Sequence, residues 1–309
     1  MPEKPAHSIL KVLAYFDIFQ YPLTKEEIYI FLEQQMHPDE VEAWLQQMTA
    51  LQQIFKLGDF YSLHNDAALR ERRMAGNAKA RNMMPLAFRN ASFLFRFPFV
   101  RGIGISGSLS KNFADQNSDI DFFIITSPNR LWIARTLMHL FKKITFLTGT
   151  YKGYCMNYYI DEEALCIEEQ NIFTATELIT LIPVCGNGAL SRFFDSNEWT
   201  NAYFPNTVPG KKALLVNRPS WLKQTMEWLL NNRLGNAIDN YFMRLTSKRW
   251  QQKEEEQRLN ASGRRMGLRN SKHASKPNPV YLQQMIVAAY EQKIREAEYR
   301  IKFPDRYIA

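Results

Sequence analysis

The sequence predicts an α+β fold in which a mixed sheet is flanked by helices. Residues 98–185 alternate short apolar strands with helical stretches, whereas the segments on both sides repeat apolar residues mainly at helical spacing. The chain has 309 residues, of which 46% are hydrophobic, and this is enough for two or three domains with buried cores. We therefore expect a sheet-containing domain between two helical regions.

Residues 1–65 predict a small helical module that ends in a hairpin. Three successive stretches, HSILKVLAYFDIF, YPLTKEEIYIFLEQQ and PDEVEAWLQQMTALQQ, have helical periodicity. Thr24 and Glu27 stand in capping-box register at the start of the second helix, and Gly58 and Asp59 mark a turn between two short strands. Three helices followed by a β-hairpin resemble a winged-helix domain.

The charge of this module disfavours DNA binding, which is the function of many winged-helix domains. Residues 1–65 contain 4 lysines, no arginine and 9 acidic residues. The third helix carries Asp39, Glu40 and Glu42 and no basic residue, so DNA phosphates would repel it. We expect the module to pack against the rest of the chain or to bind a protein partner. A DNA-binding regulator is an alternative function that this charge disfavours.

Residues 66–97 predict a basic helical connector that Pro85 interrupts. Residues 66–101 contain 8 basic and 2 acidic residues. A basic tract attracts phosphate groups, but it is also typical of a solvated helix face. The arginines open to both interpretations are Arg70, Arg72, Arg73 and Arg81.

The central domain, residues 98–185, contains four predicted strands, PFVRGIGIS, DIDFFIIT, GYCMNYYI and ALCIEE. Residues 186–309 predict a helical region, with a continuous helix over 220–245 and a final helix over 278–302. Between these helices, residues 250–278 are polar and basic and predict a mobile stretch.

The composition also bears on location. The most apolar stretch, residues 131–147, contains Arg135, Lys142 and Lys143 and predicts an amphipathic helix, so we expect no membrane association. The N-terminus MPEKPAHSIL has no apolar signal core, and the three cysteines show no metal-binding or pairing pattern. These features predict a cytoplasmic protein with free thiols.

The stretch GISGSLSKNFADQNSDIDFFII carries the chemistry. Its Gly107-Ser108 turn follows an apolar strand, so the backbone can approach a phosphate closely and the serine can donate a hydrogen bond. Asp119 and Asp121 are alternate residues of the next strand, which places both carboxylates on one face. Two adjacent carboxylates repel each other unless a divalent cation lies between them, and Mg²⁺ prefers oxygen ligands.

This arrangement resembles the signature of the polymerase-beta-like nucleotidyltransferase superfamily, in its minimal-type, uncharacterised bacterial branch. The resemblance implies that Gly107 and Ser108 contact a nucleoside triphosphate and that Asp119 and Asp121 bind catalytic Mg²⁺ or Mn²⁺. Lys111, which follows the turn, is expected to assist phosphate binding. The motif covers about 20 residues, and it implies a nucleotidyltransferase mixed sheet in residues 98–185.

One part of the superfamily pattern is missing. The superfamily usually adds a third carboxylate, on a later strand, that serves as the base for the acceptor hydroxyl. The strand GYCMNYYI offers Asn157 on the face expected to hold Cys155 and Tyr159, and an amide can bind a metal but cannot accept a proton near neutral pH. The acidic candidates that follow this strand are Asp161, Glu163 and Glu168.

Two functions of different classes follow from these residues. The first is an ATP-binding or other NTP-binding transferase that moves a nucleoside monophosphate to an unknown acceptor, which is a small molecule, an RNA or a protein. The second is a nucleotide-binding regulatory or scaffold protein whose transferase domain is degenerate. A carboxylate within about 5 Å of the aspartate pair, close enough to share a metal, separates the two.

Overall fold

The computed structural model describes residues 4–147, 154–207, 215, 220–256, 268–277 and 280–302.

The N-terminal module contains the elements that the sequence predicts, in the predicted order. The helices are α1 (Lys4–Asp17), α2 (Lys25–Ile30) and α3 (Pro38–Ala50), and the hairpin strands are β1 (Phe55–Leu57) and β2 (Phe60–Ser62). The Thr24 side chain accepts a hydrogen bond from Glu27 N while the Glu27 side chain accepts one from Thr24 N, which is the predicted capping box. The winged-helix assignment itself stays a prediction.

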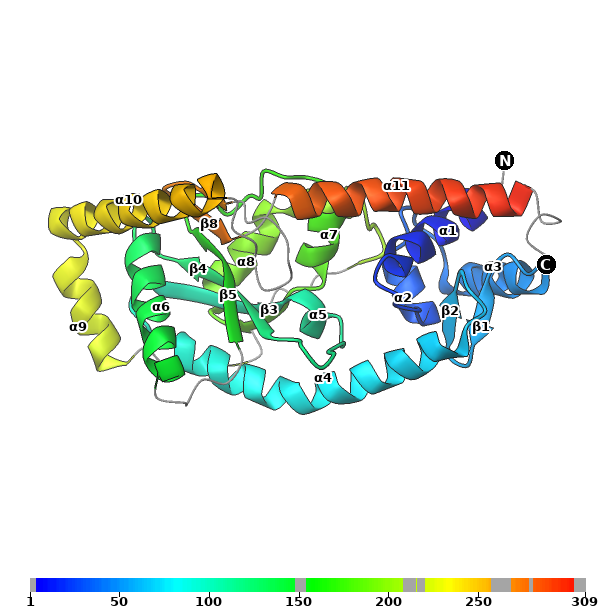
Figure 1. Cartoon of the computed structure of the whole chain (residues 1–309), viewed down its shortest axis with the longest axis horizontal. Helices are drawn as coiled ribbons and strands as arrows, with labels where there is room; N and C mark the ends of the chain where they lie inside the picture. The colour runs from blue at the N-terminus through cyan, green and yellow to red at the C-terminus, as the bar shows by residue number, and fades with distance from the viewer. Residues whose placement is uncertain are drawn as a thin grey trace.

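The connector is one long helix, α4 (Ala67–Leu94), with Pro85 inside it. The expectation that Pro85 interrupts the helix is therefore wrong. In Figure 1, α4 runs beneath the molecule from the N-terminal module to the sheet. Buried alanines 80, 87 and 91 on one face pack against the sheet core, and this packing offsets the loss of one backbone donor at the proline.

The sheet is mixed, and its strand order is β6-β3-β4-β5-β8-β7. Its strands are β3 (Val100–Ser106), β4 (Ile120–Thr126), β5 (Tyr154–Asp161), β6 (Ile182–Cys185), β7 (Leu268–Asn270) and β8 (Ala274–Pro277). Only β4 and β5 are parallel; the other described pairs are antiparallel. The predicted α+β class, a mixed sheet with flanking helices, is confirmed.

The two strands at one end of the sheet come from a segment that the sequence predicts to be mobile. β7 and β8 lie within residues 250–278, and residues 250–255 continue a helix. Residues 257–267 and 278 lie outside the described residues. The β8 strand pairs with β5, with Ser275 opposite Tyr159 and Ala274 opposite Ile160. The sheet therefore extends beyond residues 98–185.

Further helices surround the sheet. They are α5 (Gly107–Ser110), α6 (Leu131–Leu147), α7 (Ile172–Ile179), α8 (Asn187–Ser196), a short 3₁₀ helix (Glu198–Ala202), α9 (Trp221–Leu230), α10 (Arg233–Glu255) and α11 (Val280–Lys302). The helix predicted over 220–245 is two helices, because Asn232 caps α10 by accepting a hydrogen bond from Gly235 N. The segment ALCIEE forms no strand.

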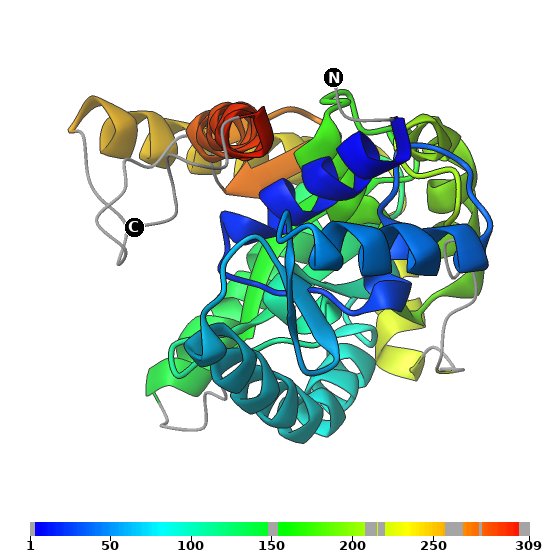
Figure 2. The ribbon, with the colours of Figure 1, turned by 90° about the vertical axis from the view of Figure 1, so that its right-hand side faces the viewer.

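Three apolar cores hold these layers together. One sheet face packs against α4, α6 and α10, and the other face packs against α7 and α8. The third core joins the N-terminal module to α7 and α11, and it includes Phe16, Ala175 and Ile286. Figure 2, which looks along the molecule from the N-terminal module, shows α11 end-on above the module and α4 below it.

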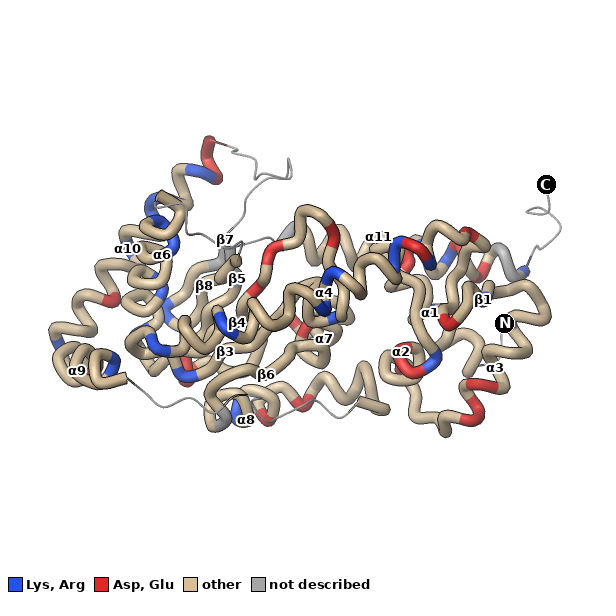
Figure 3. The backbone as a smooth tube through the Cα atoms, turned by 90° about the horizontal axis from the view of Figure 1, so that it is seen from below, with Lys and Arg blue, Asp and Glu red and all other residues tan. Residues whose placement is uncertain are grey.

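Figure 3 shows acidic residues on the α2 and α3 side of the molecule and basic residues on α4, α6 and α10. Arg73, one of the α4 arginines left open by the sequence, is buried and pairs with Glu27, with 2.6 Å between its Nη2 and Glu27 Oε1. Arg72 donates to the carbonyl oxygens of Phe19 and Gln20. Both arginines therefore attach the N-terminal module to α4. Among the described helices, none is both long and apolar enough to cross a membrane.

Candidate nucleotidyl transfer site

A cavity of about 640 Å³ opens beside the Gly-Ser turn. Gly107, Ser108, Lys111 and Asp121 all line it, so the fold brings these four sequence candidates to one wall. The turn ends β3, and Asp121 lies directly opposite it because Ser106 pairs with Asp121 in the antiparallel β3–β4 ladder. The motif is thus assembled by a single strand pairing.

Gly107 is required where it stands for two independent reasons. Its φ is +69°, a conformation that side-chain-bearing residues rarely adopt. A Cβ atom at this position would also lie 2.4 Å from Asp121 Oδ2, well inside contact distance. The glycine therefore allows the backbone turn and the carboxylate to approach each other directly.

Asp119 lies just before β4 and is exposed, whereas Asp121 is partly buried within the strand. Cys155 of β5 neighbours both residues: it is paired with Asp121 in the β4–β5 ladder, and its Sγ lies 3.4 Å from Asp119 Oδ2. Burial raises the pKa of the Cys155 thiol to about 11, and both aspartates add to this shift. Cys155 is therefore a neutral thiol beside the two acids.

The electrostatics of Asp121 favour a bound cation. Burial, the Glu177 carboxylate and the Asp119 carboxylate, in that order of size, raise the pKa of Asp121 to about 7, while Lys111 and Lys142 oppose the rise. A divalent cation between the aspartates would remove this repulsion, and oxygen donors at the end of a strand suit Mg²⁺ or Mn²⁺. Asp119 and Asp121 therefore fit the metal that the motif implies.

Glu177, which the sequence reasoning missed, is one of three carboxylates on the cavity wall, together with Asp115 and Asp121. It projects from α7, and its Oε1 lies 2.7 Å from Lys111 Nζ. The same ammonium donates to Gly107 O at 3.1 Å, so Lys111 holds Glu177 beside the Gly-Ser turn. A signal was present: α7 presents Phe173, Thr174, Glu177 and Leu178 to the cavity, and Glu177 is the charged residue on this mostly uncharged helix face.

A register shift in β5 changes which of its residues face the aspartates. Phe122 pairs with Met156 but Phe123 pairs with Tyr158, so Asn157 is an extra residue in the ladder. Tyr158, rather than Tyr159, therefore shares a face with Cys155, and the expected alternation through Tyr159 is wrong. The side chain of Asn157 lies outside the described part of the structure.

The structure does not bring Asp161 to the aspartate pair. Asp121 pairs with Cys155 near the start of β4, whereas Asp161 pairs with Thr126 at its end. Thr126 comes five residues after Asp121 along β4, so the Asp161 position lies about 17 Å along the strand from Asp121. Glu163 lies beside Asp161, and Glu168 is exposed in the loop before α7 and is not one of the described residues that line the cavity.

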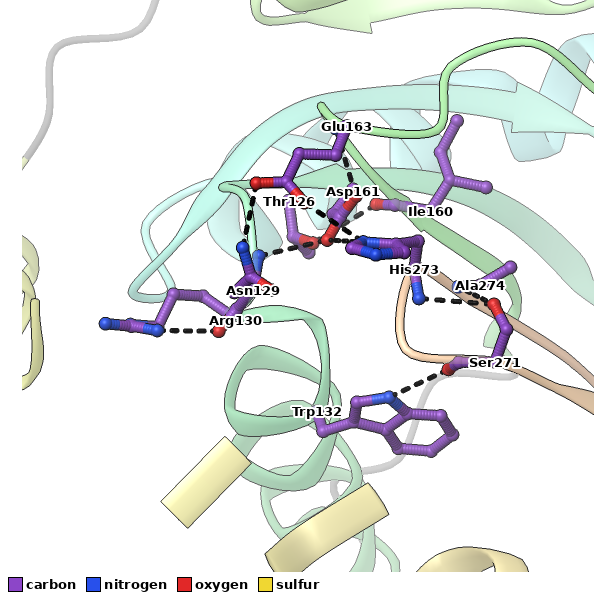
Figure 4. Close-up of polar contacts among 10 residues, drawn as sticks. All are labelled: Thr126, Asn129, Arg130, Trp132, Ile160, Asp161, Glu163, Ser271, His273 and Ala274. Carbon is purple, nitrogen blue, oxygen red and sulfur yellow. Dashed lines mark hydrogen bonds and ion pairs between the residues drawn. The ribbon is translucent and has the colours of Figure 1, made fainter. Parts of the chain in front are cut away.

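Asp161 and Glu163 instead belong to a network at the far end of the sheet (Figure 4). The fully buried Asp161 carboxylate accepts hydrogen bonds from Asn129 N and Glu163 N, both at 3.0 Å, and lies 2.9 Å from His273 Nδ1. Ligand atoms of Asp161, Glu163 and His273 lie within 4.8 Å of one another and could hold a metal. However, both Asp161 oxygens already bind donors, so the contacts are those of a structural junction between β5, the α6 loop and the β7–β8 hairpin.

Replacement of Asp161 by alanine is expected to lower the free energy of unfolding by about 2–4 kcal/mol, because the backbone N–H groups of Asn129 and Glu163 lose a fully buried acceptor. Chemical denaturation of both chains measures this loss. Glu163→Ala, at an exposed position of the same network, is the control and should cost less than about 1 kcal/mol. A stable Asp161→Ala chain that has lost metal-dependent nucleotide binding would contradict the structural role.

The N-terminal module contacts the site directly. The Tyr21 hydroxyl donates a short hydrogen bond to Lys111 O, and the Tyr21 and Phe113 rings meet edge to face with centroids 5.7 Å apart. The Arg72 guanidinium lies 4.6 Å from the centroid of the Phe113 ring. The loop that follows the Gly-Ser turn therefore contacts both α4 and the N-terminal module.

A family model described as a nucleotidyltransferase domain matches residues 90–171. This range includes β3, the Gly-Ser turn, Asp119, β4 with Asp121, and β5. No curated protein and no solved structure matches the chain. The mixed sheet with flanking helices fits a nucleotidyltransferase fold. The family match thus supports placing residues 90–171 in the nucleotidyltransferase superfamily.

Proposed function

We propose that the chain transfers a nucleoside monophosphate from a nucleoside triphosphate to an acceptor hydroxyl, with Asp119 and Asp121 holding Mg²⁺ or Mn²⁺. The observation that carries the proposal is the direct contact between the Gly107 turn and the Asp121 carboxylate on the wall of one cavity. A phosphate-binding turn beside a pair of carboxylates is the minimum that in-line phosphoryl chemistry requires.

Each residue has a separate task in this proposal. The Gly107 backbone and Ser108 position the triphosphate, and Glu177 accepts the proton of the acceptor hydroxyl. The hydroxyl oxygen forms a bond to the α-phosphorus as the bond to the α–β bridging oxygen breaks, and pyrophosphate leaves with that electron pair. When bound, the metal would neutralise charge on the phosphates.

Glu177 takes the place that the superfamily pattern gives to a third carboxylate. Its support is its position on the cavity wall, its fixed distance from Lys111 and its electrostatic coupling to Asp121. Lys111 is thereby partly neutralised, so its contribution to phosphate binding is smaller than the sequence suggests. The base is proposed to come from α7 because β5 offers the neutral Cys155 at the position facing Asp121.

We expect at least one of ATP, GTP, CTP and UTP to bind only when Mg²⁺ or Mn²⁺ is present. Asp121→Asn and Asp119→Asn should each weaken this binding by on the order of tenfold or more, because a charged metal ligand becomes neutral. Asp121→Asn should leave the thermal unfolding midpoint unchanged or higher, since burial and neighbouring acids oppose the charge on Asp121. Titration calorimetry and a thermal scan measure both effects.

Asp59→Asn, which makes the same chemical change at an exposed position in the β1–β2 turn, is the matched control. Negligible binding heat for all four nucleotides with both metals would refute the proposal.

The alternative is a nucleotide-binding regulatory or scaffold protein with a degenerate transferase domain. The observation that favours it is the Cys155 thiol at the β5 position facing Asp121, where an acid would complete the pattern. It predicts metal-dependent nucleotide binding without pyrophosphate release. The N-terminal module would then be the site for a protein partner.

A further inference from the structure

The cavity beside the Gly-Ser turn is far more apolar than a phosphate site needs. Away from the turn, its walls carry aromatic rings from several elements, including Tyr15 and Phe16 of α1, Phe123 of β4, Tyr158 of β5 and Phe173 of α7. Leu282 and Ile286 of α11 close it from another side. We call this part of the space, beyond Gly107 and Ser108, the aromatic cavity.

We infer that the aromatic cavity binds the acceptor, and that the acceptor is a small molecule with a flat apolar body and a hydroxyl group. The inference rests on the proposed function, because it assigns the second substrate of the same site. It narrows the acceptor from three classes, which are a small molecule, an RNA and a protein, to the first.

The wall chemistry disfavours the triphosphate as the occupant of this space. Moving a polyphosphate from water into an aromatic enclosure is costly unless cations compensate for it. The wall carries three acids and three cations, which are Asp115, Asp121, Glu177, Arg72, Lys111 and Lys276, so it has no excess of positive charge for a polyphosphate. Each cation also contacts a group of the chain: Lys111 pairs with Glu177, Arg72 donates to Phe19 O and Gln20 O, and Lys276 lies 5.0 Å from the centroid of the Tyr158 ring. A flat ring system, by contrast, packs well against aromatic faces and edges.

The same carboxylates suit a hydroxyl. Glu177 lies on the wall at the end of the cavity that Gly107 and Asp121 also line, so a hydroxyl directed to that end meets both the proposed base and the phosphate turn. The rest of the molecule would extend toward α1 and α11. Thr174 and Gln283, which are buried and hydrogen-bonded to each other at 3.2 Å, provide polar groups in that direction.

The size of the cavity and the charges on its wall disfavour a macromolecule. A volume of about 640 Å³ is typical of small-molecule sites. The cavity is covered by α1 from the N-terminal module and by α11 from the other end of the chain, and these helices pack against each other. The cations that line it also contact groups of the chain, since Arg72 lies over the Phe113 ring, Lys111 pairs with Glu177 and Lys276 lies over the Tyr158 ring. An RNA strand would require a groove with available cations.

The test uses naphthol, a flat fluorescent ring system with one hydroxyl, as the probe and the full chain as the protein. Fluorescence titration should show saturable binding. Leu282→Trp, which fills the cavity, should weaken binding by on the order of tenfold or more. Met285→Trp is the matched control, because Met285 lies on the same helix with 59% of its surface exposed, and it should leave binding unchanged. Phe173→Ala, which removes a wall ring, provides a second variant in case Leu282→Trp does not fold.

Competition separates the acceptor from the nucleotide. Naphthol should still bind when Mg²⁺ and a non-hydrolysable triphosphate analogue saturate the chain. Complete displacement by the analogue would overturn the inference, because the cavity would then hold the nucleoside. Naphthol binding that neither Leu282→Trp nor Phe173→Ala weakens would overturn it as well, as would label transfer from a nucleoside triphosphate to the end of an RNA oligonucleotide. Triphosphate binding is measured separately on the same variants. A chain that binds triphosphate with metal but not naphthol would contradict the acceptor site alone, whereas a chain that binds no triphosphate would contradict the proposed function.

Discussion

Replacement of Glu177 by glutamine is expected to reduce pyrophosphate release by about 10²–10⁴-fold, which is the usual cost of removing a positioned general base. The amide has nearly the shape of the carboxylate but cannot accept a proton near neutral pH. Binding of the metal-nucleotide complex should be retained or strengthened, since Glu177 adds negative charge beside Asp121. Pyrophosphate release, with water as the acceptor when no other is supplied, and calorimetric binding of the triphosphate are measured on the same samples.

Glu168→Gln is the control for Glu177→Gln. Glu168 lies in the loop that leads into the same helix, but it is exposed and does not line the cavity. Its replacement should leave pyrophosphate release within about twofold of the wild-type rate, because a surface change of this kind is close to neutral. Equal activity of both variants would remove Glu177 from the mechanism. A wild-type chain that binds triphosphate and releases no pyrophosphate would favour the degenerate transferase.

Replacement of Arg73 by methionine is expected to destabilise the chain by about 3–5 kcal/mol, the cost of breaking a buried ion pair. The Arg73 side chain is 2% exposed. It pairs with Glu27, donates to Pro22 O and to Asn77 Oδ1, and lies 3.8 Å from the centroid of the Tyr21 ring. Methionine keeps the apolar stem but leaves the Glu27 carboxylate and the Pro22 carbonyl without this donor. Urea denaturation followed by fluorescence measures the loss.

Arg70→Met is the matched control, because Arg70 stands one helical turn earlier on α4 and is exposed. This variant should change stability by less than about 0.5 kcal/mol. Arg73→Met should also weaken naphthol binding, since Tyr21 links the module to the loop after the Gly-Ser turn. Similar stabilities of the two variants would show that Arg73 does not hold the module in place.

Several features could be predicted from sequence because short-range physics determines them. The capping box at Thr24 needs only residues within one helical turn, and the β1–β2 turn needs only Gly58 and Asp59. The approach of Gly107 to Asp121 follows from one antiparallel pairing between neighbouring strands. Local periodicity also predicted α11 to within two residues at its start.

Other expectations failed where a distant contact or a local irregularity intervened. The extra residue at Asn157 reverses the faces of Tyr158 and Tyr159, and nothing in the alternation of GYCMNYYI predicts it. The basic, polar composition of residues 250–278 predicts mobility, yet residues 268–277 form two strands at one end of the sheet, because β8 pairs with the buried β5. Pro85 remains inside α4 because the packing of that helix against the sheet outweighs one missing hydrogen bond.

The sequence by itself determined the α+β class, the Gly107-Ser108 turn and the Asp119 and Asp121 pair, because these depend on residue type and on spacing within about 20 residues. The tertiary structure alone decided that Asp161 lies at the far end of the sheet, that Glu177 enters the cavity from α7, and that α1 and α11 close it. The physical reason is that a strand or helix pattern specifies which faces are apolar. The pattern does not specify the distant element against which each apolar face packs. That choice depends on the total apolar surface that the whole chain buries when it folds.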